Sequence, residues 1–245
     1  MPAPRDALPQ LVGALRDVFG RDLRCALLKG SVLHGDEIPY WSDLDVHAFV
    51  DGADRGAPDW PRAVAFQRAI GRHDPEAYGV SQFQVSFVPG GGYPKEWPVP
   101  YPASYEVLFG EVPASFASPS VEEHLDRAST DLARTAADRD SLVRSFVDKP
   151  DRSVARYVRL LGTYLAGKTF SAAVLLSGDP ERVHASRRAA LIHVVGEALG
   201  NERELVIFDA LAREWREVRE KPEQARAMFA AGMSALDAFA AADVG

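Results

Sequence analysis

The pattern of the sequence changes near residue 119, and this change restricts the chain to a fold of two parts. Before it, apolar runs typical of strands alternate with helical segments; after it, Ala-, Arg- and Leu-rich segments recur with helical periods and few strand signals. Ser120 and Glu123 have the spacing of a capping box, which begins a helix. We therefore predict a part with both strands and helices over 1–118 and an all-α helical bundle over 119–245.

Local signals divide each part into elements. Helical spacing over 5–19 ends at Gly20, and a second helix over 60–70 carries Pro61 in its first turn. Strands are predicted at 24–30, 42–50, 80–88 and 105–109. Helices of the second part are predicted at about 120–147, 152–167, 180–200, 203–219 and 223–241.

Composition excludes several classes of protein. The chain has 245 residues, of which 47% are apolar and 26% charged, as in a soluble globular protein. It has no run of eighteen apolar residues and no apolar leader, and Cys25 is its single cysteine, so we expect a cytoplasmic protein without a membrane span, a disulfide framework or a cysteine-based zinc site. A net charge of −7 argues against binding of extended nucleic acid.

Two acids interrupt a run that otherwise has the character of a strand, in "SDLDVHAFV" over 42–50. Side chains two apart on a strand share a face, so Asp43 and Asp45 lie side by side while Leu44 and Val46 point into the core. Like charges at this distance repel, and a divalent cation between them relieves the repulsion. The pair is therefore a candidate metal site.

The acid pair lies in an acidic stretch. Between residues 36 and 59, one basic residue, Arg55, accompanies seven acids: Asp36, Glu37, Asp43, Asp45, Asp51, Asp54 and Asp59. Such a stretch attracts a metal ion or a cationic small molecule, and it is equally typical of a solvated acidic surface.

A Gly-Ser pair precedes the acids, with eleven residues between Ser31 and Asp43. Gly30 allows the backbone to approach a phosphate closely, and Ser31 adds a hydroxyl donor at a predicted helix start. Asp43 and Asp45 would hold Mg²⁺ against the triphosphate of a nucleotide. Without the metal the same carboxylates would repel the triphosphate, so the charge balance itself requires a cation.

These residues resemble the nucleotidyltransferase superfamily that includes DNA polymerase β and the aminoglycoside nucleotidyltransferases. The family pattern of an apolar residue, Gly-Ser, a spacer and Asp-apolar-Asp is supplied by Leu28, Gly30, Ser31, Asp43, Leu44, Asp45 and Val46. Within the superfamily, the order of "FQVSFVP", "PYPASYEVLFGEV" and "DRSVARYVRLLGTYLAGKTF" is similar to that of streptomycin/spectinomycin adenylyltransferases.

The resemblance implies a fold and a function. Residues 1–118 would form an α+β nucleotidyltransferase domain, a small mixed sheet flanked by helices, and 119–245 an all-α helical bundle. The implied function is Mg²⁺-dependent transfer of AMP from ATP to a hydroxyl of a small, aminoglycoside-like acceptor, with both substrates in a cleft between the two domains. Asp43 and Asp45 are then catalytic metal ligands, and Gly30 and Ser31 bind the nucleotide. Lys168, at a predicted helix end after Gly167, either reaches the triphosphate or complements that helix terminus.

The chain departs from the family pattern at three places. Gln84 occupies the position of the third carboxylate, Val112 replaces an aromatic residue that would stack on the acceptor, and a lysine expected shortly after Lys168 is missing. A glutamine oxygen can ligate a metal but takes no proton at neutral pH. His47 and Glu111 are alternative bases, each with a structural alternative, as a hydrogen-bonded histidine and as a surface residue. A binding module with little turnover is the alternative function.

Other signals leave alternatives open. Seven of the seventeen prolines lie between Pro89 and Pro119 among aromatic residues, in a segment that either borders a binding site or is an ordered connection. Trp41 either borders a nucleotide base or packs in the core. Arg188 and His193 have the Arg-x4-His spacing of helical HEPN-type ribonucleases, a short motif in an arginine-rich chain. The remaining histidines show no zinc-binding spacing; they are His34 and His73, predicted in loops, and His124 and His184, predicted in helices.

Overall fold

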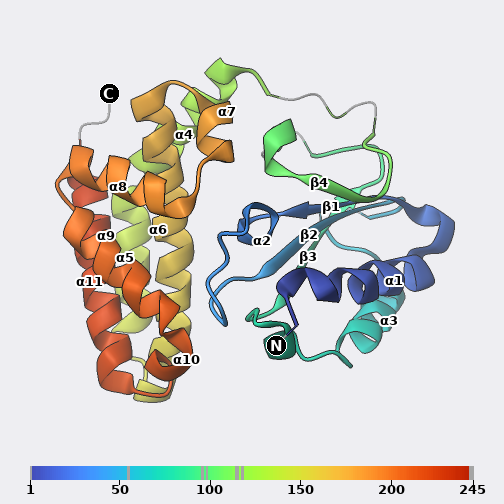
Figure 1. Cartoon of the computed structure of the whole chain (residues 1–245), viewed down its shortest axis with the longest axis horizontal. Coiled ribbons are helices and arrows are strands. Elements are labelled where there is room, and N and C mark those ends of the chain that lie inside the picture. The colour runs from blue at the N-terminus through green and yellow to red at the C-terminus, as the bar shows by residue number, and fades with distance from the viewer. Residues whose placement is uncertain are drawn as a thin grey trace. The chain divides into compact units, whose positions relative to one another are not determined.

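The chain divides into two compact units, which we call the sheet unit (Met1–Pro119) and the helical unit (Ser120–Gly245). The structure, a computed structural model, describes residues 2–53, 56–94, 97, 99–113, 116 and 119–242. The sheet unit contains a four-stranded mixed sheet with helices, and the described part of the helical unit contains helices only (Figure 1). The predicted class, an α+β part followed by a helical part, is confirmed at this level. Asp54 and Arg55 of the acidic stretch lie outside the described residues.

The sheet has the strand order β3-β2-β1-β4. Its strands are β1 (Leu23–Lys29), β2 (Leu44–Val50), β3 (Phe83–Pro89) and β4 (Glu106–Gly110). The pairing of β2 with β3 is parallel, and β1 is antiparallel to both β2 and β4. All four predicted strands form, although β3 begins three residues later than predicted because Ser81 and Gln82 belong to the turn region that bonds to the start of β2.

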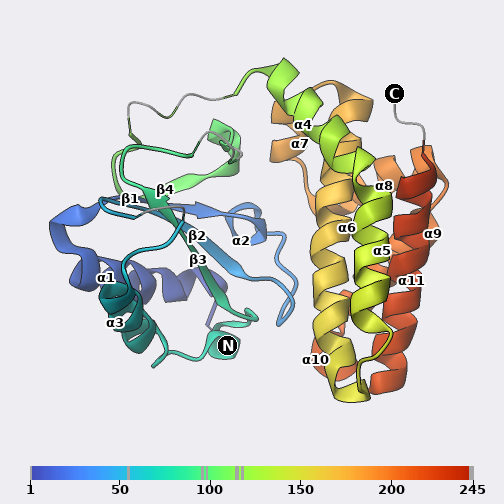
Figure 2. The ribbon, with the colours of Figure 1, turned by 180° about the vertical axis from the view of Figure 1, so that it is seen from behind.

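One face of the sheet carries the main core of this unit. The helices α1 (Leu8–Phe19) and α3 (Trp60–Ile70) lie on this face (Figures 1 and 2). Leu44 and Val46 are fully buried here, as their alternation predicts. Three rings join the layers, because Phe87 of β3 lies 5.3 Å from Phe19 and 5.5 Å from Phe66 between ring centroids.

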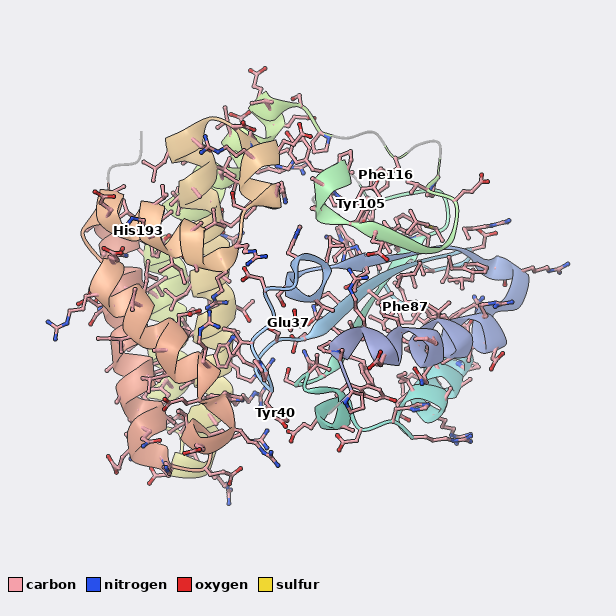
Figure 3. The ribbon with its side chains drawn as sticks, viewed as in Figure 1. Glu37, Tyr40, Phe87, Tyr105, Phe116 and His193 are labelled. Atoms are coloured by element: carbon pink, nitrogen blue, oxygen red, sulfur yellow. The ribbon has the colours of Figure 1, made fainter. Side chains whose placement is uncertain are left out.

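The opposite face has a smaller core at one end of the strands. Its buried members are Cys25, Leu27, Phe49 and Val88, and the residues that pack on them are Tyr93, Trp97, Tyr105, Val112 and Phe116. Figure 3 shows Tyr105 and Phe116 on the opposite side of the sheet from Phe87. These five described residues of the proline-rich segment therefore cover the smaller core; we call them the aromatic cover, and Val112 is one of them.

The helical unit differs from the prediction in where its helices end. Its helices are α4 (Val121–Ala133), α5 (Thr135–Phe146), α6 (Val154–Ser177), α7 (Pro180–Ala185), α8 (Arg188–Leu199), α9 (Glu202–Arg213), α10 (Trp215–Val218) and α11 (Pro222–Ala241). The predicted helix 120–147 breaks at Arg134, and the predicted helix 180–200 breaks before Arg188. The predicted capping box is confirmed, since the Glu123 amide donates to Ser120 Oγ (3.1 Å) and the Ser120 amide donates to Glu123 Oε2 (2.7 Å).

Helix α6 is the central helix of this unit and packs on α4, α8 and α11. It continues ten residues past the predicted end at Gly167, because an internal glycine costs a helix only about 1 kcal/mol and the packing of this helix outweighs that cost. The stretch Asp151–Ser177 is long and apolar enough to cross a membrane by length and composition alone, since an eighteen-residue window within it has a mean hydropathy of 1.2, and half of that window is buried inside the structure.

Glycine allows α11 to approach its neighbours closely. A Cβ atom built on Gly232 would lie 2.7 Å from Leu161 Cδ2 and 2.8 Å from Phe208 Cδ2, and both of these side chains are buried. By contrast, a Cβ atom on the exposed Gly167 of α6 meets no atom within 4 Å. Gly232 therefore permits close packing, whereas Gly167 only weakens its helix.

We expect Gly232→Ala to destabilise the protein by about 1–3 kcal/mol, because the added methyl group overpacks a closed interface. Gly167→Ala is the matched control and should stabilise the protein by up to about 1 kcal/mol through helix propensity. Denaturant unfolding monitored by circular dichroism measures both changes. Equal effects of the two substitutions would contradict the close packing at Gly232.

Candidate functional site

Three polar side chains lie in one row across the sheet, at the end of the strands that the predicted motif occupies. Lys29 of β1 is in register with Asp45 of β2, and Asp45 is in register with Gln84 of β3. The adjacent row, which includes Leu28 and Val46, points into the main core. Because side chains alternate, Lys29, Asp45 and Gln84 point to the opposite face, and we call them the polar row.

Asp43 and Asp45 interact electrostatically, as the alternation of the strand predicts. Asp45 is partly buried, and this burial, followed by the charge of Asp43, raises its pKa to about 6, while the charge of Lys29 acts in the opposite direction. Asp43 accepts hydrogen bonds from the Ser81 hydroxyl and from Gln82 Nε2, the latter at 3.0 Å. The structure therefore brings the two carboxylates together and fixes the first of them through the turn that precedes β3.

Gly30 lies directly against Asp45. Its backbone has φ +74° and ψ −162°, a conformation that essentially only glycine adopts, and a Cβ atom built there would lie 2.4 Å from Asp45 Oδ2. Ser31 follows as the first residue of α2 (Ser31–His34), so the predicted helix start is confirmed. The Gly-Ser turn and the acid pair are thus neighbours in space, although eleven residues separate them in sequence.

A tight turn leads from α2 into β2 and orients Asp43. Tyr40 has φ +61° and is the one non-glycine residue with positive φ in the described part of the chain; its amide donates to the carbonyl of Gly79 (2.7 Å). The Ile38 amide donates to Ser42 Oγ (2.9 Å), which closes the turn. Trp41 is buried within it, which agrees with the packing alternative for this residue.

His47 lies two residues beyond Asp45 and under the aromatic cover. Its Nδ1 atom is 2.8 Å from the hydroxyl of Tyr93. Burial, with a smaller effect of the Lys29 charge, lowers its pKa to about 3, so the imidazole is uncharged at neutral pH. A histidine with so low a pKa is a weak base, and the geometry agrees with the structural alternative, a hydrogen-bonded histidine.

Gln84 is the neighbour of Asp45 on the β3 side. Its side-chain Oε1 accepts a hydrogen bond from Gln82 Nε2 at 3.2 Å, and the same nitrogen donates to Asp43. The amide oxygen of Gln84 therefore belongs to the hydrogen-bond network of the acid pair. Glu111, the other proposed base, follows β4 and is exposed, which agrees with its alternative as a surface residue.

The donors of this site fit a hard cation. The carboxylates of Asp43 and Asp45 and the amide oxygen of Gln84 are neighbours at this end of β2 and β3, and Mg²⁺ prefers oxygen ligands, typically one or two carboxylates with water and phosphate oxygens. No group of three or more His, Cys, Asp or Glu residues forms a metal site within the described ranges. A cation at Asp43 and Asp45 would therefore complete its shell with water or with a phosphate-bearing ligand.

The acidic stretch is partly neutralised. Arg24 Nε donates to Asp51 at 2.7 Å, and Arg62 Nε donates to Asp59 at 2.5 Å. The Arg24 side-chain hydrogen bond lowers the pKa of Asp51, and hydrogen bonds from the Arg62 amide and then from its guanidinium lower the pKa of Asp59. Two acids of the stretch are therefore already paired with arginines.

Lys168 does not lie at a helix end, so this part of the prediction is wrong. It lies inside α6 with a side chain that is 1% exposed. Its ammonium donates to the Asp131 carbonyl (2.5 Å) and the Asp131 carboxylate (2.7 Å), and it lies 2.9 Å from Asp138 Oδ2. These three acceptors match the three protons of an ammonium. Contact with a nucleotide stays a prediction, and it requires these bonds to exchange.

The other histidines and the HEPN-like pair have partners of their own. Arg188 Nε donates to Asp209 at 2.8 Å, and the exposed His193 lies 2.7 Å from Glu202, whose hydrogen bond raises the pKa of this histidine. Figure 3 shows His193 on α8. The rings of His124 and His184 contact each other within the helical unit. His34 lies in α2, where a loop is predicted, because the Gly-Ser turn is followed by one helical turn.

Comparison of the chain with known protein families and with curated proteins finds no match. The residues and their geometry therefore carry the functional argument.

We expect Gly30→Ala to destabilise the protein by about 1–3 kcal/mol, because alanine is strained at this φ and ψ, and to displace the Asp45 carboxylate. Binding of Mg²⁺ with ATP, followed by calorimetry, should be lost in this variant. Gly35→Ala is the control, since Gly35 also has positive φ (+63°) but its Cβ atom would meet nothing within 4 Å. It should cost about 1 kcal/mol and leave binding intact; loss of binding in both variants would contradict a specific role of Gly30.

Proposed function

We propose that this protein is a Mg²⁺-dependent nucleotidyltransferase that moves AMP from ATP to a hydroxyl group of a small, aminoglycoside-like acceptor. The observation that carries the proposal is the contact of the Gly30 backbone with the carboxylate of Asp45, beside Asp43. The Gly-Ser turn and the acid pair are thereby neighbours on the face of the sheet opposite the main core. The turn would admit a phosphate, and the acid pair would attract a cation.

The chemistry asked of the site is an in-line displacement at phosphorus. The acceptor oxygen forms a bond to the α-phosphorus, the bond from this phosphorus to the bridging oxygen breaks, and its electron pair leaves with pyrophosphate. Mg²⁺, when bound, would offset the charge of the phosphates. Asp43 and Asp45 would hold that cation, and Gly30 and Ser31 would admit the triphosphate on the side of β1.

The acceptor hydroxyl would lose its proton without help from a third carboxylate. Gln84 lies in register with Asp45, and its amide can orient a hydroxyl or ligate a cation but cannot take the proton at neutral pH. General-base catalysis is worth about 10²- to 10⁴-fold in rate, so transfer of the proton to water predicts a slow enzyme rather than an inactive one. ATP and the aminoglycoside-like acceptor rest on the family resemblance, and the acids around the site favour a cationic acceptor.

The test is release of pyrophosphate from ATP with Mg²⁺ and a panel of hydroxyl-bearing cationic acceptors. Asp43→Ala and Asp45→Ala should each abolish it, because either change removes a carboxylate from the cation site. Asp51→Ala, which removes an acid that Arg24 already neutralises, should leave it unchanged. Because the pKa of Asp45 is raised to about 6, protons should compete with Mg²⁺, and its affinity should fall as the pH drops below about 6. Wild-type release from either alanine variant would refute the proposal.

A binding module with little turnover is the second candidate, and the amide of Gln84 in the polar row favours it. This candidate predicts that Mg²⁺ and ATP bind in calorimetry while no acceptor yields pyrophosphate. Gln84→Glu should then create or accelerate transfer, because it adds a proton acceptor beside Asp45. Gln84→Met, which matches the side chain in size without a carboxylate, is the control. Rapid transfer by the wild type would exclude the module.

A further inference from the structure

We propose that Lys29 is a nucleotide-binding residue that contacts the phosphate groups from the β1 side of the acid pair. This inference rests on the proposed function and adds to it, since Lys29 belongs to neither the Gly-Ser turn nor the Asp-Leu-Asp motif. The sequence shows it only as a lysine that follows the apolar run Cys25–Leu28, where the end of β1 gives a sufficient reason for a polar residue.

The position of Lys29 connects the two halves of the motif. It is the last residue of β1 and directly precedes Gly30, so it lies on the side of the acid pair from which the Gly-Ser turn extends. Across β2, the opposite neighbour of Asp45 is Gln84. The polar row thus runs from a cation through an acid to a neutral amide. A polyanion at the turn meets the cation, and an uncharged hydroxyl group suits the amide side.

Lys29 is a partly buried cation that no ion pair or hydrogen bond satisfies within the described part of the chain, and Asp45 affects it through space only. Burial of an ammonium without a partner is costly. Lys168, the buried lysine of the described residues, has different surroundings, because three oxygen atoms lie around its ammonium. The contrast indicates that Lys29 is kept available for a ligand rather than for the fold.

The charges also favour a polyanion over a simple counter-charge. With Mg²⁺ at the acid pair, the +2 of the cation cancels the −2 of Asp43 and Asp45. The two carboxylates then no longer offset the charge of Lys29, and the cation repels its ammonium. A polyphosphate at the turn restores the balance, since its negative charge is shared between Mg²⁺ and Lys29. The lysine therefore fits a ligand that arrives together with the metal.

The experiment measures binding of sodium tripolyphosphate with Mg²⁺ by calorimetry, which reports phosphate contact without catalysis. Lys29→Met should weaken this binding about tenfold or more, as expected for loss of a charge-assisted contact, and should weaken binding of ATP to a similar extent. Lys29→Arg keeps the charge and should retain most of the affinity. Arg24→Met is the control, because it removes one positive charge from the same strand at the exposed pair with Asp51. Unfolding curves confirm that each variant is folded.

Tripolyphosphate binding in Lys29→Met that equals that of the wild type would overturn the inference, as would absence of tripolyphosphate binding in the wild type. A similar loss in Arg24→Met would also overturn it, since the effect would then be one of net charge. The two proposals fail separately. If pyrophosphate release depends on Asp43 but polyphosphate binding is unchanged in Lys29→Met, the transferase proposal is supported and this inference is refuted. If polyphosphate binding depends on Lys29 but no acceptor yields pyrophosphate, the inference stands and the transferase falls.

Discussion

The repulsion between two carboxylates at the start of β2 is the constraint on which the site depends. Leu44 and Val46 pack in the main core, so Asp45, which lies between them, points to the opposite face. Asp43 is its charged neighbour there. The burial that raises the pKa of Asp45 also makes this carboxylate costly to ionise without a cation. In our proposal, a bound cation offsets this cost.

The face of the sheet opposite the main core has an apolar end and a polar end. At one end of the strands, Phe49 and Val88 are covered by aromatic residues of the proline-rich segment, and Tyr93 reaches from this cover to His47. At the other end, the polar row lies beside Gly30. His47 is therefore a weak base, because burial lowers its pKa and its Nδ1 atom lies at hydrogen-bond distance from the Tyr93 hydroxyl. What remains beside the acid pair is an amide on one side and an ammonium on the other.

The helical unit handles buried charge in the opposite way. Lys168 is buried more completely than Lys29, yet Asp131 and Asp138 surround it at hydrogen-bond distance. A buried ion pair that is fully satisfied adds specificity to a fold, because alternative packings would leave its members unpaired. The buried Lys168 therefore serves the fold, whereas the partly buried Lys29, in our proposal, serves a ligand.

The sequence alone determined what local physics controls. Alternation placed Leu44 and Val46 in the core and both acids on one side, the Ser120 capping box began α4, and the four strands and the helix at 60–70 followed from apolar period and from Gly and Pro. Only the tertiary structure decided which residues meet across the chain. The register that aligns Lys29, Asp45 and Gln84, the contact of Gly30 with Asp45 and the burial of Lys168 inside α6 depend on pairing between distant segments. Local propensity carries no information on such pairing, because it is selected by the packing of the whole unit.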